Sequence, residues 1–139
     1  MISIILAMRV DTHADSLIGS VMTGSVASID AQATLRQAAK ALTIAEVGTL
    51  VIMDDAEIAG IVSERDIIRA LADGVAPDVG RVADVMTHDP RYLTLGDRVA
   101  TAAEIMLDAG IRHLPVIEEG ELVGIVSIRD LAASLLEIA

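Results

Sequence analysis

Two segments of the sequence place a serine, an arginine and an aspartate at the spacing S-x-R-D. They are Ser63, Arg65 and Asp66 in the first half of the chain, and Ser127, Arg129 and Asp130 in the second. Each segment follows an apolar run and precedes a stretch of helical periodicity. The serine therefore stands where a strand passes into a helix.

The S-x-R-D segments allow two interpretations, which are compatible with each other. In the first, the serine and the aspartate form a capping box that satisfies amides at the helix start. In the second, free amides and the positive end of the helix dipole attract a phosphate, and the serine and arginine add hydrogen bonds to it. The aspartate would repel a phosphate but suits the two hydroxyls of a ribose. Together these side chains would recognise a nucleotide.

Further candidate residues lie near the two hairpins. Arg112 and His113 precede an apolar strand and are candidate phosphate contacts, with a solvated surface position as the alternative. The corresponding positions in the first half are Gly48 and Thr49, which lack this charge. Thr23 and Thr87 each follow a methionine and precede a predicted strand, where capping of a helix or strand is the simple explanation.

The remaining motifs give little support for catalysis. The sequence contains no G-x-S-x-G, Walker loop or H-E-x-x-H pattern. The three histidines are scattered without metal-ligand spacing, and there is no cysteine. Acidic pairs such as Asp54-Asp55 and Glu118-Glu119 fall in polar turns, where solvated charge is typical. We therefore expect neither an enzyme nor a metal site.

Composition narrows the class of partner. The net charge is −11 and the pI is about 4.4, which disfavours nucleic acids and anionic membranes. Hydrophobic residues make up 53% of the 139 residues, so the chain can form a core. The apolar run Met1–Met8 is shorter than the roughly 20 residues of a membrane span. It could add a strand, or Met8 could be the true start.

The sequence repeats itself at an offset of 64 residues, which dominates its organisation. The tripeptide V-M-T occurs at residues 21–23 and 85–87, and G-I-V-S-x-R-D occurs at residues 60–66 and 124–130. No gap is needed between the two anchors, so we conclude that the chain is an internal duplication. We divide it into an extension (1–18), a first repeat (19–74), a linker (75–84) and a second repeat (85–139).

Each repeat predicts the same element order. Short strands are expected at 26–30 and 90–94, helices at 34–46 and 98–109, hairpins over 50–62 and 114–126, and helices at 64–73 and 128–137. One such unit buries too little surface to be stable alone. We predict a mixed α/β (α+β) fold of two β-α-β-β-α repeats, packed sheet to sheet about a pseudo-two-fold axis, with ligand clefts between them.

The duplicated motifs resemble the tandem CBS-domain family, whose paired repeats are called Bateman modules. The resemblance rests on V-M-T, the helix beginnings A-T-L and R-V-A-T, the strand I-R-H-L-P-V-I and G-I-V-S-x-R-D, all in order and duplicated. It covers residues 19 to 137. The first copy departs from the second by having Val26 and Val51 where the second has Pro90 and Pro115.

The resemblance implies a module that binds adenosine-containing ligands such as AMP, ADP or ATP in its clefts. The resemblance assigns the ribose to the aspartate and the phosphate to the serine, and it implies two clefts between the repeats. One would combine Thr87, Ile111, Arg112 and His113 with Ser63 and Asp66; the other would combine Thr23, Val47 and Thr49 with Ser127 and Asp130. We favour the first, because it holds Arg112 and His113.

The same resemblance implies a homodimer and an output that acts on a separate, unknown protein partner. We therefore expect a stand-alone regulatory module in the cytoplasm that requires no cofactor and has the adenosine nucleotide as its regulatory ligand. The alternative is a ligand-free structural or dimerisation module in which the S-x-R-D segments are only helix caps.

Overall fold

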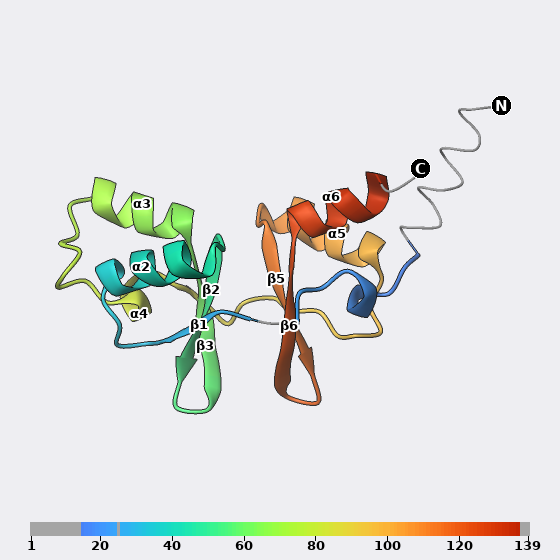
Figure 1. The fold of residues 1–139 in the computed structure, drawn as a ribbon, viewed down its shortest axis with the longest axis horizontal. Coiled ribbons are helices and arrows are strands. Elements are labelled where there is room, and N and C mark those ends of the chain that lie inside the picture. Colours follow the sequence, from blue (N-terminus) through green and yellow to red (C-terminus); the bar gives the residue numbers. More distant parts are fainter. Residues whose placement is uncertain (1–14, 25, 137–139) are drawn as a thin grey trace. The chain divides into compact units, whose positions relative to one another are not determined.

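The computed structural model describes residues 15–24 and 26–136, which form two compact units (Figure 1). Unit 2 consists of residues 26–90. Of the described residues, unit 1 joins 15–24 to 91–136. The run Met1–Met8, expected to add a strand or to precede the true start, lies outside the described residues.

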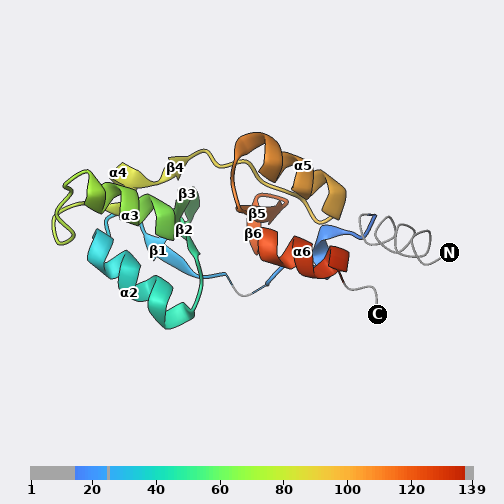
Figure 2. The ribbon, with the colours of Figure 1, turned by 90° about the horizontal axis from the view of Figure 1, so that it is seen from above.

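Unit 2 is a sheet with two longer helices and one short helix packed against it (Figure 2). The strand order is β1-β2-β3-β4; β1 pairs with β2 in parallel, and the other pairs are antiparallel. Its elements are β1 (Ser28–Asp30), α2 (Leu35–Ala45), β2 (Thr49–Asp54), β3 (Glu57–Ser63), α3 (Glu64–Ala72), α4 (Val82–Val85) and β4 (Thr87–His88).

Unit 1 repeats this order with fewer paired strands. Its elements are η1 (Ile18–Ser20), α5 (Val99–Ala109), β5 (His113–Glu118), β6 (Glu121–Ser127) and α6 (Ile128–Leu136). The strand expected over 90–94 is reduced to one parallel bridge between Leu93 and Val116. The predicted mixed α/β fold of two β-α-β-β-α repeats is confirmed. None of the described helices has the length and apolar character needed to cross a membrane.

The cores of the two units use equivalent positions of the duplication. In unit 2, Leu50 and Ile52 of β2 point from the sheet toward the helices, and Leu114 and Val116 of β5 do the same in unit 1. All four side chains are fully buried, and each contributes about 1.5–3 kcal/mol relative to exposure. Their partners on the helices also match: Leu35, Ala38, Leu42 and Ile67 in unit 2 correspond to Val99, Ala102, Met106 and Leu131 in unit 1.

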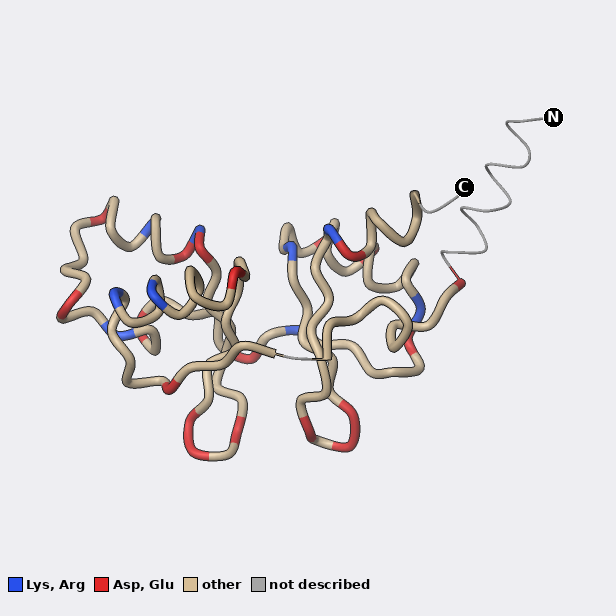
Figure 3. Tube along the Cα trace, viewed as in Figure 1, with Lys and Arg blue, Asp and Glu red and all other residues tan. Residues whose placement is uncertain are grey.

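Tight acidic turns connect the strands of each hairpin, as predicted (Figure 3). Asp55 adopts φ 56° in the first turn, and Glu119 and Gly120 adopt φ 51° and 80° in the second. Positive φ at these positions matches the right-handed twist of the flanking strands. The charged tips lie at the turns, away from the ends of the strands that carry the S-x-R-D segments.

The segment expected to be a linker makes defined contacts with helix α2. The carbonyls of Gly80 and Pro77 accept hydrogen bonds from the amides of Leu35 and Arg36, at 3.0 Å each. The Arg36 guanidinium donates two hydrogen bonds to the Asp78 carboxylate, from Nε to Oδ1 at 2.5 Å and from Nη2 to Oδ2 at 3.1 Å. This bond lowers the pKa of Asp78 and raises the pKa of Arg36. The linker thus satisfies helix amides that would otherwise lack partners.

Candidate functional site

The first S-x-R-D segment forms the corner between β3 and α3. Ser63 is the N-cap of α3; its Oγ accepts from the amide of Asp66 at 3.2 Å. The carboxylate oxygen Asp66 Oδ2 accepts in return from the amide and the hydroxyl of Ser63, at 2.8 and 3.0 Å. The capping box anticipated from the spacing is present. The other carboxylate oxygen, Oδ1, stays outside this box.

The second segment builds the same corner between β6 and α6. Ser127 Oγ accepts from the amide of Asp130 at 3.1 Å, and Asp130 Oδ2 accepts from the amide of Ser127 at 2.9 Å. Both serines and both aspartates are half-buried, whereas Arg65 and Arg129 are exposed. The arginines are therefore accessible to an anion in solution.

The first amide of helix α3 and that of helix α6 each donate a hydrogen bond to a backbone carbonyl, and the sequence did not reveal these bonds. The amide of Glu64 donates to the Gly48 carbonyl at 3.0 Å, and that of Ile128 donates to the Arg112 carbonyl at 2.8 Å. The third amide belongs to the capping box. The expected cluster of free amides is therefore smaller than the spacing suggested, and the second amide, that of Arg65 or Arg129, remains for an outside acceptor.

The two V-M-T segments pair with the hairpins of the opposite copies. Thr87 in β4 lies opposite Ile61 of β3, and Thr23 lies opposite Ile125 of β6. The Thr23–Ile125 pair exchanges two backbone hydrogen bonds of 2.9 and 3.0 Å. Each threonine is exposed and lies beside the strand that ends in Ser63 or Ser127 two residues later. The structure thus joins the predicted Thr, Ser and Asp within one unit.

The residues at the strand starts lie beside the serine of their own unit. Thr49 pairs with Ser63, and His113 pairs with Ser127. Thr49 is only 4% exposed, and its Oγ1 is buried without a hydrogen-bond partner. His113 and Ile111 are half-buried, whereas Arg112 and Val47 are exposed. An unpaired buried hydroxyl is unfavourable, and because this one has no exposed surface, the ligand contact predicted for Thr49 stays a prediction.

The predicted site residues divide between the units. Unit 2 holds Ser63, Arg65, Asp66, Thr87, Val47 and Thr49, and unit 1 holds Ser127, Arg129, Asp130, Thr23, Ile111, Arg112 and His113. Each Thr, Ser and Asp set is therefore assembled. The predicted combination of one set with the strand-start residues of the other unit stays a prediction.

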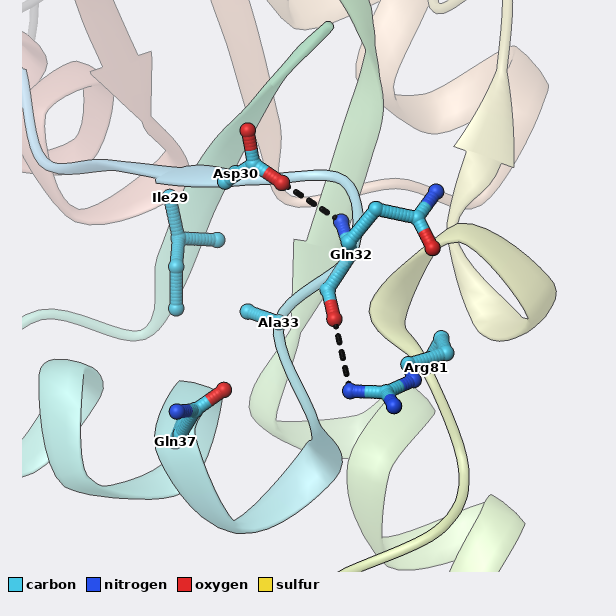
Figure 4. A pocket seen from close by; sticks show the side chains of 6 residues that line it. All are labelled: Ile29, Asp30, Gln32, Ala33, Gln37 and Arg81. Atoms are coloured by element: carbon cyan, nitrogen blue, oxygen red, sulfur yellow. Dashed lines mark hydrogen bonds between the residues drawn. The ribbon is translucent and has the colours of Figure 1, made fainter.

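Two features of unit 2 were not anticipated. Arg69 lies one helical turn after Asp66, and its Nη1 is 3.9 Å from Asp66 Oδ1; the i, i+3 spacing could have indicated it. An open surface pocket of about 580 Å³ lies near β1 and the start of α2 (Figure 4). In it, Arg81 donates to the Gln32 carbonyl at 2.9 Å, and Asp30 accepts from the Gln32 amide at 2.8 Å.

The comparisons with known proteins identify the family of this two-unit fold. The CBS domain model matches residues 18–73 and 82–137, once for each copy. The chain therefore belongs to the CBS domain family and carries two CBS domains in tandem. The resemblance read from the motifs is confirmed.

Relatives share this pair over different fractions of their length. The chain is 38% identical to a 17.7 kDa protein of Acidianus ambivalens over 124 residues, which cover 87% of the chain and 74% of the relative. Two further curated relatives are longer, and the chain spans 52% and 39% of their lengths.

Solved structures agree with the fold. A CBS domain protein of Pyrobaculum aerophilum, in complex with AMP, is 35% identical with a TM-score of 0.80, covering 88% of this chain and 98% of its own. A protein with CBS domains from Burkholderia ambifaria is 26% identical with a TM-score of 0.84, covering 87% of this chain and 94% of its own.

Proposed function

We propose that the chain is a regulatory module that binds an adenosine nucleotide, AMP, ADP, ATP or a related adenosyl ligand. The observation that carries this proposal is the assembly, in each unit, of one Thr, one Ser and one Asp around a helix start. The AMP complex of the Pyrobaculum aerophilum relative, at 35% identity over nearly its whole chain, supports the same ligand class.

The chemistry of each corner suits the two polar parts of a nucleotide. The serine hydroxyl, the Arg65 or Arg129 guanidinium and the remaining first-turn amide favour a phosphate. The aspartate can accept from ribose hydroxyls, because its Oδ2 is committed to the cap while Oδ1 is directed elsewhere. The capping and ligand roles therefore use different atoms of one side chain.

The proposed clefts combine residues of both units. Ser63, Asp66 and Thr87 would act with Ile111, Arg112 and His113, and Ser127, Asp130 and Thr23 with Val47 and Thr49. The first set contains Arg112 in addition to Arg65, so we assign it the higher affinity for a phosphate. At its strand start, the second set has the buried Thr49 hydroxyl in place of the imidazole of His113.

The output of the module is proposed to pass to a separate protein partner. Every helix longer than one turn carries exposed apolar side chains, including Ile44 (83% exposed), Ile68 (66%), Leu107 (76%) and Leu136 (72%). Such side chains favour burial against another surface, and we propose a homodimer and partner contact through these helices. The module is proposed to act in the cytoplasm without catalysis and without a required cofactor.

Calorimetry on the purified protein with AMP, ADP, ATP and S-adenosylmethionine tests this function. We expect saturable binding of at least one of these ligands, and mass spectrometry of the native protein should detect the same class of molecule. Absence of binding at millimolar ligand, with cooperative unfolding retained, would contradict the proposal. It would favour the second candidate, a ligand-free dimerisation module, which the two intact capping boxes also support.

A further inference from the structure

The two glycines of the repeated G-I-V-S segments lie where a V-M-T segment crosses the strand. Gly60 of β3 pairs with His88, and a Cβ on Gly60 would overlap the carbonyl oxygen of Thr87. The same Cβ would lie 2.8 Å from Met86 Sδ. Both are closer than packed atoms approach one another, so this position accepts no side chain without movement of its neighbours.

Gly124 of β6 repeats the arrangement in unit 1. A Cβ there would lie 2.5 Å from Met22 Sδ and 2.9 Å from the Thr23 carbonyl oxygen. Neither glycine has the positive φ that would make glycine necessary for conformational reasons. Space for the crossing segment is therefore what these two positions provide.

We propose that Gly60 and Gly124 are positioning residues, each of which sets the place of one ligand-site threonine. We call the space left by the missing side chain of each glycine a notch. The notch at Gly60 lets the Thr87 backbone lie against β3, beside Ile61 and two residues from Ser63. The notch at Gly124 does the same for Thr23, next to Ile125 and Ser127. The ligand part of this inference rests on the proposed function, whereas the placement part does not.

The two notches differ in the atom that fills them. At Gly60 the nearest obstacle is a backbone carbonyl, so an added methyl group must move β4 itself. At Gly124 the nearest obstacle is the thioether of a flexible methionine, and the backbone oxygen is second. Truncating Met22 should therefore relieve much of the strain of Gly124→Ala, whereas truncating Met86 should leave the strain of Gly60→Ala largely in place.

Amide hydrogen exchange of the whole protein without ligand tests the placement. Gly60→Ala should speed exchange at Thr87 by at least tenfold and leave the Thr23 and Ile125 amides unchanged. Gly124→Ala should do the reverse, and the double variant G124A/M22A should restore part of the slow exchange at Thr23, because the contact with the Thr23 carbonyl oxygen remains. The matched double variant G60A/M86A should not restore it at Thr87.

Titration with AMP, followed by the amide signals of Asp66 and Asp130, tests the ligand part. We expect Gly60→Ala to weaken binding at the Asp66 corner about tenfold, as for one lost hydrogen bond to a charged group, and to spare the Asp130 corner. Equal weakening at both corners would indicate a general loss of stability and overturn the assignment. So would unchanged exchange in Gly60→Ala.

The outcomes separate the two proposals. If the parent protein binds no AMP while Gly60→Ala still releases Thr87, the proposed function fails and the positioning role stands. Should Gly60→Ala fail to fold, the pair G124A and G124A/M22A decides the matter alone. Rescue by Met22→Ala supports the notch, and absence of rescue overturns it.

Discussion

Replacing Asp66 by asparagine should separate the capping role of this side chain from its proposed ribose contact. In the structure, Asp66 Oδ2 accepts two hydrogen bonds from Ser63, at 2.8 and 3.0 Å, while Oδ1 lies 3.9 Å from Arg69 Nη1. An asparagine can put its one side-chain oxygen in the Oδ2 position and keep both bonds. Its amino group then occupies the place where Oδ1 offered an acceptor.

The expected magnitudes follow from these contacts. Because the cap is kept, Asp66→Asn should change the free energy of unfolding by less than about 0.5 kcal/mol. Asp66→Ala keeps the bond from the backbone amide of residue 66 to Ser63 Oγ but leaves the Ser63 amide without a partner, so it should lower that free energy by about 1 kcal/mol. The lost acceptor should weaken AMP binding in both variants by about 1.5 kcal/mol or more, roughly tenfold.

Urea unfolding and calorimetry with AMP measure the two effects on the same preparations. Asp130→Asn is the matched control, because it makes the same change at the other corner and should leave the Asp66 corner intact. If Asp66→Asn binds AMP as tightly as the parent protein at both corners, the ribose role is wrong. If Asp66→Asn and Asp66→Ala lower stability equally, the capping bonds do not act as the geometry indicates.

Three further predictions concern the scaffold and the second corner. The ion pair with Arg36 lowers the pKa of Asp78, so it stabilises the folded linker at neutral pH. This contribution is lost as the pH falls through the folded-state pKa. Amide exchange at Arg36 should therefore be faster in Asp78→Asn than in the parent protein at pH 7, and the two proteins should not differ in acid. Glu46 ends α2 in the left-handed conformation (φ 55°) where Gly110 ends α5, so Glu46→Gly should raise and Gly110→Ala should lower the free energy of unfolding by about 1 kcal/mol in urea titrations. Thr49→Val should raise the melting temperature, because it removes a buried unpaired hydroxyl, while weakening AMP binding at one corner; a lower melting temperature would show that the hydroxyl has a partner.

The elements and cores could be predicted because the duplication supplies each position twice. Leu50 and Leu114, or Ala38 and Ala102, are apolar at the same place in both copies and are fully buried in both units. A periodic apolar pattern reports burial directly, since it reflects which side of a helix or strand faces the core. The short helix α4 escaped detection because four residues are too few for a helical period to show.

The site could be predicted in its side chains but not in its backbone partners. Ser63 and Asp66 carry a recognisable spacing, and the structure joins them as a capping box. The carbonyls of Gly48 and Arg112 occupy the adjacent helix amides, and a carbonyl has no signature in the sequence because every residue has one. The burial of Thr49 likewise depends on packing around the strand start and not on the residue type.

The two structural units do not have the same boundaries as the two copies of the sequence repeat. Thr87 belongs to the second copy by sequence, yet its backbone completes the sheet of unit 2, and the chain then reaches the buried Leu93 of unit 1 within six residues. A ligand that contacted both Thr87 and Ser63, as proposed, would also hold the start of the segment that leads to Leu93. Binding can shift the balance between two states only by its difference in affinity for them. The proposed ligand contact at Thr87 and the buried Leu93 are joined by one short segment, so a shift of this segment would change ligand affinity and core packing together.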